Sequence, residues 1–252
     1  MEHPVSTSDL TTHSATGGSA TRLGFWTAIL TVFVIAVFAV VAIATPARSG
    51  PFCGNACVAY PNVDVARFVP GDYLWLLPGI LLAPIFVVLM ACIHASAAES
   101  KKVYSRIGLA FALVYAVVIL VDYFVQLTVV APSLQAGETE GLSLFTQYNP
   151  HGLFIALEAL GYSMMTVALL FAAPVFASGK AERAIRALFT LSFVLAVAAF
   201  VALAVLGRDL VAFEVTVLMI TWIVLIASGV LLGVVFRRAG RIPERLRDGR
   251  DT

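Results

Sequence analysis

The sequence predicts an all-α fold, a polytopic membrane helix bundle of six transmembrane helices with both termini in the cytoplasm. Three observations lead to this prediction. Of the 252 residues, 60% are hydrophobic and only 12% are charged, whereas a soluble domain carries about 25% charged residues. The apolar residues form six long runs, and a run of about 18 or more favours a membrane-spanning helix. Lys and Arg are also divided very unequally among the segments between these runs.

The six runs define one transmembrane domain over residues 24–236, and its spans are 24–45, 73–95, 107–131, 151–177, 187–206 and 210–235. Backbone groups in lipid must find their hydrogen bonds within a helix or a closed barrel. Barrel strands would be about 10 residues long and alternate in polarity, which these runs do not. The spans are therefore expected to be helices.

The charge distribution predicts how the chain is threaded through a cell membrane. If the amino terminus is cytoplasmic, the inner segments hold thirteen Lys and Arg residues, and the outer segments hold three, Arg48, Arg67 and Arg208. Because cytoplasmic segments carry the excess of positive charge, both termini are expected inside. The composition is compatible with a bacterial inner membrane.

The two ends of the chain are polar. Residues 1–23 are rich in Ser, Thr and Gly and are expected to form a disordered cytoplasmic tail. Residues 237–252 form a basic cytoplasmic tail, expected beside anionic lipid rather than on nucleic acid. The first apolar run, which follows Arg22 and ends near Ala42-Ile43-Ala44, also resembles a cleaved signal peptide. It exceeds the usual apolar length of about 7–15 residues, which favours a retained helix.

Local sequence predicts how several spans begin. Asp72 is expected to cap the second span, and Asn149 the fourth, with Pro150 at the first helical position. The turn Gly207-Arg208-Asp209 is short enough to make the last two spans an antiparallel hairpin. The fifth span, 187–206, is almost entirely apolar and is expected to face lipid.

The first outer loop contains two cysteines, Cys53 and Cys57. Outside the cytoplasm they could form a local disulfide, or they could be two small unpaired loop residues. A zinc site would need more ligands than this loop offers. No metal site is therefore expected here.

Acidic residues inside three spans are the best indication of a functional site. Asp122, Glu158 and Glu214 lie in runs that are otherwise apolar. A charged side chain at the centre of a bilayer costs roughly 2.5–3.5 kcal/mol on insertion scales. Glu214 is within about one turn of the membrane interface, so solvation there is an alternative for it.

Helical spacing aligns these acids with other polar residues, because residues at i, i+7 and i+11 share one face of a helix. The stripes are Tyr115, Asp122 and Gln126 on the third span and His151, Glu158 and Tyr162 on the fourth. On the sixth span, Glu214, Thr221 and Ser228 repeat every seven residues.

The three stripes place their polar groups in the same outer half of the membrane. At 1.5 Å per residue, Asp122 lies roughly 13 Å and Glu158 roughly 10 Å from the outer ends of their helices. Gln126, His151 and Glu214 lie closer to the surface. The stripes therefore predict a polar cavity open to the outside, with Asp122 and Glu158 at its floor and His151 at its mouth.

Tyr123 and Trp75 are candidate walls of this cavity. The same polar residues could instead only hold helices together, through bonds that contribute about 0.6 kcal/mol each.

Three classes of function remain open. The first is a binding or transport site for a small cation, a proton or an amphiphile. Six helices are few for a transporter, which favours a homo-oligomer in that case. The second is an intramembrane enzyme that uses His151, Glu158 and Asp122 as acid and base on a lipid-like substrate. The third is an accessory membrane subunit without chemistry.

The sequence contains no phosphate-binding loop, nucleophile elbow or HExxH motif. His94 and His151 are expected near opposite membrane surfaces, which argues against haem ligation between them. We expect no cofactor, no metal and no nucleic-acid partner, and the lipid bilayer is the one partner that the composition requires.

The segments GDYLWLLPG, DYFVQLTVVAPSL and QYNPHGLFIALEALGY resemble uncharacterised multi-pass bacterial integral membrane proteins. The resemblance covers about residues 70–175. It implies a multi-pass membrane fold and no particular activity.

Overall fold

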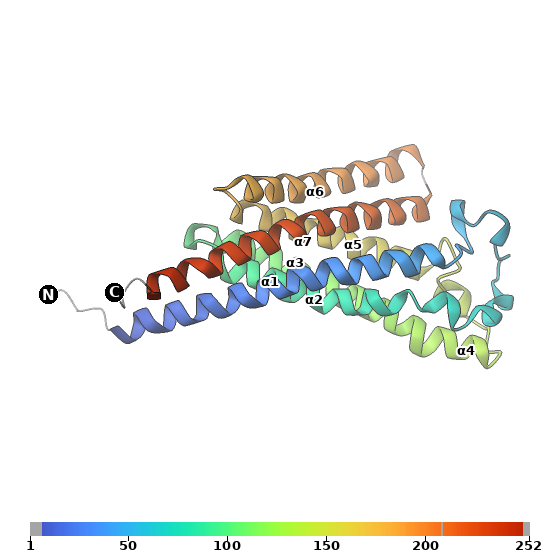
Figure 1. Ribbon diagram of the computed structural model, residues 1–252. Helices are drawn as coiled ribbons and strands as arrows, with labels where there is room; N and C mark the ends of the chain where they lie inside the picture. Colours follow the sequence, from blue (N-terminus) through green and yellow to red (C-terminus); the bar gives the residue numbers. More distant parts are fainter. Residues whose placement is uncertain (1–6, 208, 249–252) are drawn as a thin grey trace.

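A computed structural model describes the backbone of residues 7–207 and 209–248, and the side chains of 18–62, 64–207 and 209–240. Within these residues, six helices are long and apolar enough to cross a membrane, which confirms the number of spans expected from the sequence. They run side by side along one direction (Figure 1). The six spans are Gly18–Ala44, Gly71–Ala95, Glu99–Gln135, Leu153–Val175, Lys180–Leu206 and Leu210–Gly240.

The regular elements are almost all α-helical. The α-helices are α1 (Thr7–Ala44), α2 (Leu76–Ala95), α3 (Lys102–Val125), α4 (Ala131–Gln135), α5 (Leu153–Ala172), α6 (Lys180–Leu206) and α7 (Leu210–Asp248). Short 3₁₀ turns occupy the connections: η1 (Gly50–Phe52), η2 (Gly54–Ala56), η3 (Val63–Phe68), η4 (Gly71–Tyr73), η5 (Glu99–Lys101), η7 (Leu142–Leu144) and η8 (Ala173–Val175). A π-helical segment, η6 (Gln126–Val130), joins α3 to α4.

The helical backbone continues beyond the spans at both ends of the chain. α1 begins at Thr7, so it includes most of the segment 1–23 in which the composition predicts disorder, and residues 1–6 lie outside the described residues. α7 extends to Asp248, through most of the basic segment 237–252. A helix that is already nucleated gains one hydrogen bond for each residue added, and each extension continues a long apolar helix.

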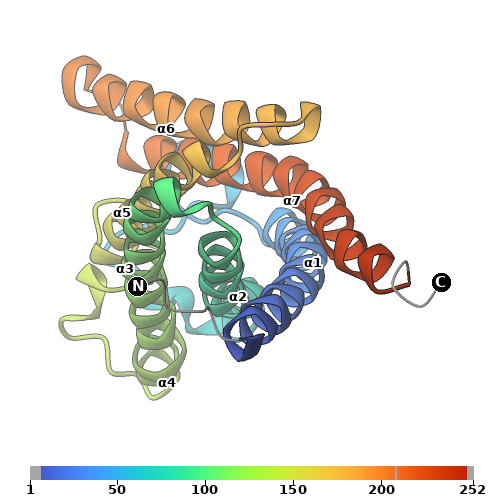
Figure 2. The same ribbon diagram turned by 90° about the vertical axis from the view of Figure 1, so that its left-hand side faces the viewer.

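Five of the spanning helices form a closed ring. α1 packs on α2, α2 on α3, α3 on α5, α5 on α7, and α7 on α1, while α6 lies outside the ring against α5 and α7. Figure 2 shows this arrangement along the bundle, with α6 across one side. The buried residues of α6 are Ile185, Phe189, Ser192 and Ala196. Most of its surface is therefore exposed in the structure, and contact of this surface with lipid remains a prediction from the sequence.

The connections gather at two opposite ends of the bundle (Figure 1). We call the end that carries segments 45–75 and 136–152 the loop end. At the other end lie Thr7, Asp248 and the connections 96–101 and 176–179. The Thr7 and Asp248 ends of the chain are therefore on the same side, as an even number of crossings requires. Which side faces the cytoplasm remains the prediction made from the positive charges.

Small residues let α3 and α5 approach closely. A Cβ atom added to Gly108 would lie 2.9 Å from the carbonyl oxygen of Ala168 and 3.3 Å from the amide nitrogen of Ala172. Further along the same interface, Gly161 of α5 faces Ile119 of α3. Such close approach is a common source of helix association in membranes, where lipid tails are as apolar as the side chains.

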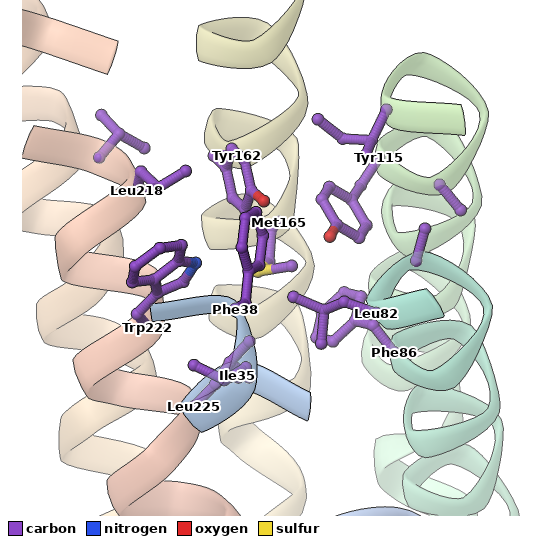
Figure 3. Packing of buried hydrophobic residues seen from close by; sticks show 14 of the residues in the cluster. Ile35, Phe38, Leu82, Phe86, Tyr115, Tyr162, Met165, Leu218, Trp222 and Leu225 are labelled. Atoms are coloured by element: carbon purple, nitrogen blue, oxygen red, sulfur yellow. The ribbon is translucent and has the colours of Figure 1, made fainter. Parts of the chain in front are cut away.

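The bundle is well packed on the side of the site that lies away from the loops. Phe38, Leu82, Phe86, Met165 and Leu225 are almost completely buried there. Figure 3 shows these side chains filling the space between helices below Tyr162 and Tyr115. This apolar core borders the polar residues of the candidate site on the side away from the loops.

Pro132 explains the π-helical segment η6. Proline has no amide hydrogen, and its ring conflicts with the carbonyl group four residues earlier, which here is Thr128. A local π-helical widening accommodates such a break without ending the helix. α3, η6 and α4 therefore belong to one continuous span, Glu99–Gln135, which extends beyond the predicted 107–131 at both ends.

The prediction that α5 begins at Pro150 is wrong, because the helix begins at Leu153. The side chain of Asn149 does act locally, but it accepts a hydrogen bond from the backbone N–H of His151 at 3.0 Å. Its amide group also donates to the carbonyl oxygen of Ser143 at 2.7 Å. Asn149 therefore closes a turn before the helix, a conformation that Asn side chains favour.

The turn between α6 and α7 agrees with the predicted hairpin. Gly207 ends α6 with a left-handed φ of 61°, which glycine adopts without steric cost. Asp209 then accepts hydrogen bonds from the backbone N–H groups of Val211 and Ala212 and caps α7. Arg208 lies outside the described residues.

Candidate functional site

The site is built on a tyrosine–glutamate contact between α3 and α5. The phenol of Tyr123 donates a hydrogen bond to Oε1 of Glu158, and both residues are almost completely buried. The Tyr162 hydroxyl lies 3.5 Å from that of Tyr123. The close, antiparallel packing of α3 against α5 therefore places two phenols around one carboxyl group in the interior of the bundle.

Glu214 of α7 completes an acid pair with Glu158. The two acids line the same cavity and lie close enough to interact with each other, and Glu214 is also buried. An ionised carboxylate can only accept hydrogen bonds, so a hydrogen bond between the two carboxyl groups would require one of them to be protonated. The two residues are thus a buried pair of acids that can hold one proton between two helices.

The meeting of these two acids follows from where their helices begin. Glu158 is five residues after Leu153, and Glu214 is four residues after Leu210. At 1.5 Å per residue, both lie roughly 6–8 Å below the loop ends of their helices. Glu214 is only 6% exposed, so solvent reaches it only through the cavity described below.

A cavity of about 420 Å³ reaches the acid pair from the loop end. This volume is within the range of about 300–1,000 Å³ found for small-molecule sites. It lies between α1, α5, α7 and the segment 45–52. Ile43 and Phe52 line it and are themselves 81% and 56% exposed, so the cavity opens at the surface there.

Apolar and aromatic side chains form most of the cavity wall. From the loop end inward, the last lining residues on α1, α5 and α7 are Phe38, Glu158 and Trp222. Other lining residues are Trp75, Phe154, Ile155, Val215 and Leu218. Trp75 is a wall of the cavity, as expected from the sequence. Tyr123 contacts two of the lining residues, Glu158 through a hydrogen bond and Trp75 through its ring.

Trp222 contributes an unsatisfied donor to this cavity. It is only 4% exposed, and within the described residues its buried indole N–H has no hydrogen-bond partner. Its ring packs against Phe38 with centroids 4.6 Å apart. In Figure 3 the nitrogen edge of the indole faces the interior of the bundle, on the side of Phe38.

An ion pair holds the mouth of the cavity. Nε of Arg48 lies 2.9 Å from Oδ2 of Asp72, and both side chains are largely buried. The prediction that Asp72 caps the second span is wrong: it lies in the turn η4, with no side-chain capping bond there, and binds Arg48 instead. The Arg48 guanidinium also lies 3.7 Å from the ring centroid of Phe68, a cation–π contact.

Tyr148 completes this arrangement from the second loop. Its phenol donates a hydrogen bond to Oδ2 of Asp72 at 3.3 Å. Burial is the main reason why the pKa of Tyr148 is raised, and the negative charge of Asp72 raises it further. Tyr148 therefore remains a neutral donor to Asp72 at any physiological pH.

Breaking the Arg48–Asp72 pair is expected to loosen the loop end. Replacing Arg48 with Met should lower the free energy of unfolding by about 2 kcal/mol, because a largely buried carboxylate then loses its charged donor. Thermal unfolding of the purified protein would measure the loss, and hydrogen exchange should speed up in segment 46–72. The double variant Arg48→Met/Asp72→Asn should be more stable than the single variant; equal losses in both would argue against the pairing.

Gln126 positions the loop rather than lining the cavity. Its amide nitrogen donates to the carbonyl oxygen of Phe145 at 2.6 Å, and its amide oxygen accepts from the backbone N–H of Gln147 at 3.2 Å. Gln147 in turn bonds the Trp75 indole and the backbone oxygen of Asp72. Gln126 therefore anchors the segment whose side chains Gln147 and Tyr148 form the mouth.

Two residues expected at the centre of the site lie elsewhere. His151 is exposed and is not among the cavity-lining residues. Asp122 is buried, but the cavity does not reach it, and its Oδ2 has no hydrogen-bond partner within the described residues. Asp122 is close enough to Glu158 for their charges to interact, but Tyr123, the next residue on α3, makes the hydrogen bond to Glu158. The expected convergence of Asp122, Glu158 and His151 around one cavity does not occur, because of these three only Glu158 lines it.

Of the predicted residues, the structure brings together Glu158, Glu214 and Tyr162, with Gln126 as support. Sequence reasoning overlooked Trp222 and the Arg48–Asp72 pair. Arg48 and Asp72 lie near the two ends of the first loop, each beside a span. Two opposite charges in these positions were the sequence feature that could have indicated the ion pair. Cys53 and Cys57 in the same loop form a disulfide.

A second hollow, of about 370 Å³, lies between α5 and α6. It is lined by apolar side chains together with Ser163 and Thr166. Both hydroxyls bond to carbonyl oxygens of their own helix. This hollow therefore offers contact area and no evident chemistry.

Comparison with models of protein families, with curated proteins and with solved structures finds no match for this chain.

Proposed function

We propose that this multi-pass membrane protein binds a small amphiphilic ligand in the cavity at its loop end, with Glu158 and Glu214 as the polar anchor. The observation that carries the proposal is an acid pair exposed to an otherwise largely apolar cavity of about 420 Å³. An apolar pocket with a few convergent polar groups is the usual form of a small-molecule site. Ionisable residues within a membrane most often mark such sites.

Two features support access from the outside of the cell. The excess of Lys and Arg at the opposite end favours a cytoplasmic position for that end. The disulfide between Cys53 and Cys57 belongs to the loop end, and disulfides persist in oxidising compartments. The cavity mouth would then face the periplasm or the exterior.

The packed core of Figure 3 favours binding from one side. Below the acid pair, Phe38, Met165 and Leu225 are almost completely buried, and the described cavity does not extend past them. Transport across the membrane would require these helices to rearrange.

An acid/base enzyme that acts on a lipid-like substrate is the second candidate. It is favoured by one observation, the connected series Tyr123–Glu158–Glu214 beside an apolar cavity. Such a series can deliver and accept a proton where water is scarce. His151 would have no part in it.

Filling the cavity is the test of the proposed function. The purified protein, in nanodiscs, is titrated by calorimetry with three small amphiphiles of one skeleton: 4-phenylbutylamine, 4-phenylbutanol and 4-phenylbutyrate. At least one should bind more tightly than to empty nanodiscs, and Ile155→Trp should abolish that binding by filling the cavity. Leu153→Trp, on the exposed face of the same helix, is the control. If none of the three binds in a way that Ile155→Trp removes, the proposed function is wrong.

A further inference from the structure

The charges around the cavity do not balance. With one proton on the pair, Glu158 and Glu214 together carry one negative charge. Among the described residues, Arg48 is the positively charged residue that lines the cavity, and it is engaged by Asp72. A buried charge without a counter-charge is strongly disfavoured in an apolar environment. The pair therefore needs either a second proton or a bound cation.

The residues that line the cavity indicate which kind of cation would bind there. Divalent metal ions take six to eight oxygen ligands for calcium or a nearly ideal octahedron for magnesium. The described residues contain no group of three His, Cys, Asp or Glu that could hold a metal. The cavity instead presents the aromatic side chains of Phe38, Trp75, Phe154 and Trp222. Aromatic faces attract organic ammonium groups and also pack against apolar chains.

The unsatisfied indole of Trp222 is a second and independent sign of a ligand. A buried N–H without a partner is costly, and this one belongs to a residue that lines the cavity next to Phe38. A hydrogen-bond acceptor on a bound molecule would satisfy it. The cavity is large enough for an ammonium group, an apolar body and such an acceptor in one small molecule.

We propose that the ligand is a lipophilic organic ammonium compound, whose charged nitrogen binds between Glu158 and Glu214 and whose apolar body lies along Phe38 and Trp222. This inference rests on the proposed function and names its ligand class. No covalent step is involved: the ammonium ion takes the place of the second proton at the acid pair. An anion of the same skeleton is repelled by the pair.

The test compares the three phenylbutyl compounds directly, with the quaternary 4-phenylbutyl-trimethylammonium ion added as a cation that cannot lose its charge. Both cations should bind at least about tenfold more tightly than the alcohol, and the carboxylate should not bind. The double variant Glu158→Gln/Glu214→Gln, which cannot carry the negative charge, should weaken cation binding by roughly tenfold or more and leave binding of the alcohol unchanged. Glu138→Gln, which removes an exposed acid from the loop end, is the matched control.

The outcomes separate the two proposals. If the alcohol binds as tightly as the amine, and the double glutamine variant leaves amine binding unchanged, the ligand class is wrong although the cavity still binds amphiphiles. If Ile155→Trp does not affect any of the probes, the proposed function itself fails. A change of thermal unfolding by the double glutamine variant would be measured in parallel, so that loss of the fold is not mistaken for loss of affinity.

Discussion

Replacing Gly79 with Ala is expected to destabilise the protein and to disrupt the acid site without touching either acid. A Cβ atom on this residue of α2 would collide with the ring of Tyr123 and lie 3.2 Å from the Phe38 ring. Tyr123 has little room to move, because its ring is packed between Trp75 and Phe154. Its displacement would remove the hydrogen bond to Glu158. Overpacking lowers the free energy of unfolding by about 1–3 kcal/mol. Leaving the buried carboxyl group of Glu158 without its hydrogen-bond donor costs a similar amount.

Thermal unfolding would measure this loss, with Gly233→Ala as the control. A Cβ atom on Gly233 of α7 has no neighbour within 4 Å. Since Ala favours helix by about 1 kcal/mol over Gly, that control should be neutral or slightly stabilising. Equal unfolding temperatures for the two variants would mean that Tyr123 is not held as tightly as the packing indicates.

Replacing both Glu158 and Glu214 with Gln should raise stability and weaken ligand binding in the same variant. Gln side chains fit the same space, can hydrogen-bond to each other through their amide groups and remove both adjacent acidic groups. We expect the free energy of unfolding to rise by about 1–2 kcal/mol, the usual gain when a functional site is made less polar. Affinity for the phenylbutyl cations should fall by roughly tenfold or more.

The opposite signs of these two effects distinguish a binding site from structural polar contacts. If the acids only join α5 to α7, the variant should lose stability or keep it, and the wild-type protein should show no cation binding for the variant to lose. The same pair of measurements on Ser228→Ala provides a reference for a buried polar residue that only bonds to its own helix.

The positions of the long apolar runs predicted the six helices, because a run of about 18 or more apolar residues favours a helix long enough to span a bilayer. The beginning of α5 was harder. Pro150 suits a first helical position, but Asn149 can equally close a turn, and its contact with the Ser143 carbonyl selects the turn. That contact joins residues of one loop whose shape the local sequence does not specify.

The partners in the site depend on the order of helices around the ring, which spacing along one helix does not contain. Glu158 meets Glu214 because α7 lies between α1 and α5. Asp122 shares a stripe with buried Tyr115, yet Tyr123, one residue later, is the side chain that reaches Glu158. The position of each polar residue along its helix was therefore predictable from the sequence, whereas the side chain that it would meet inside the bundle was not.

The place of α7 in the ring has a consequence for how the protein is made. Chains are synthesised from the amino terminus, so α5 with Glu158 is made before Glu214 has been translated. Until α7 packs between α1 and α5, the ring is open and Glu158 has no acidic partner. A chain that stops before Leu210 lacks one wall of the cavity as well as one of its acids. The site is therefore complete only when the last helix of the ring has been added.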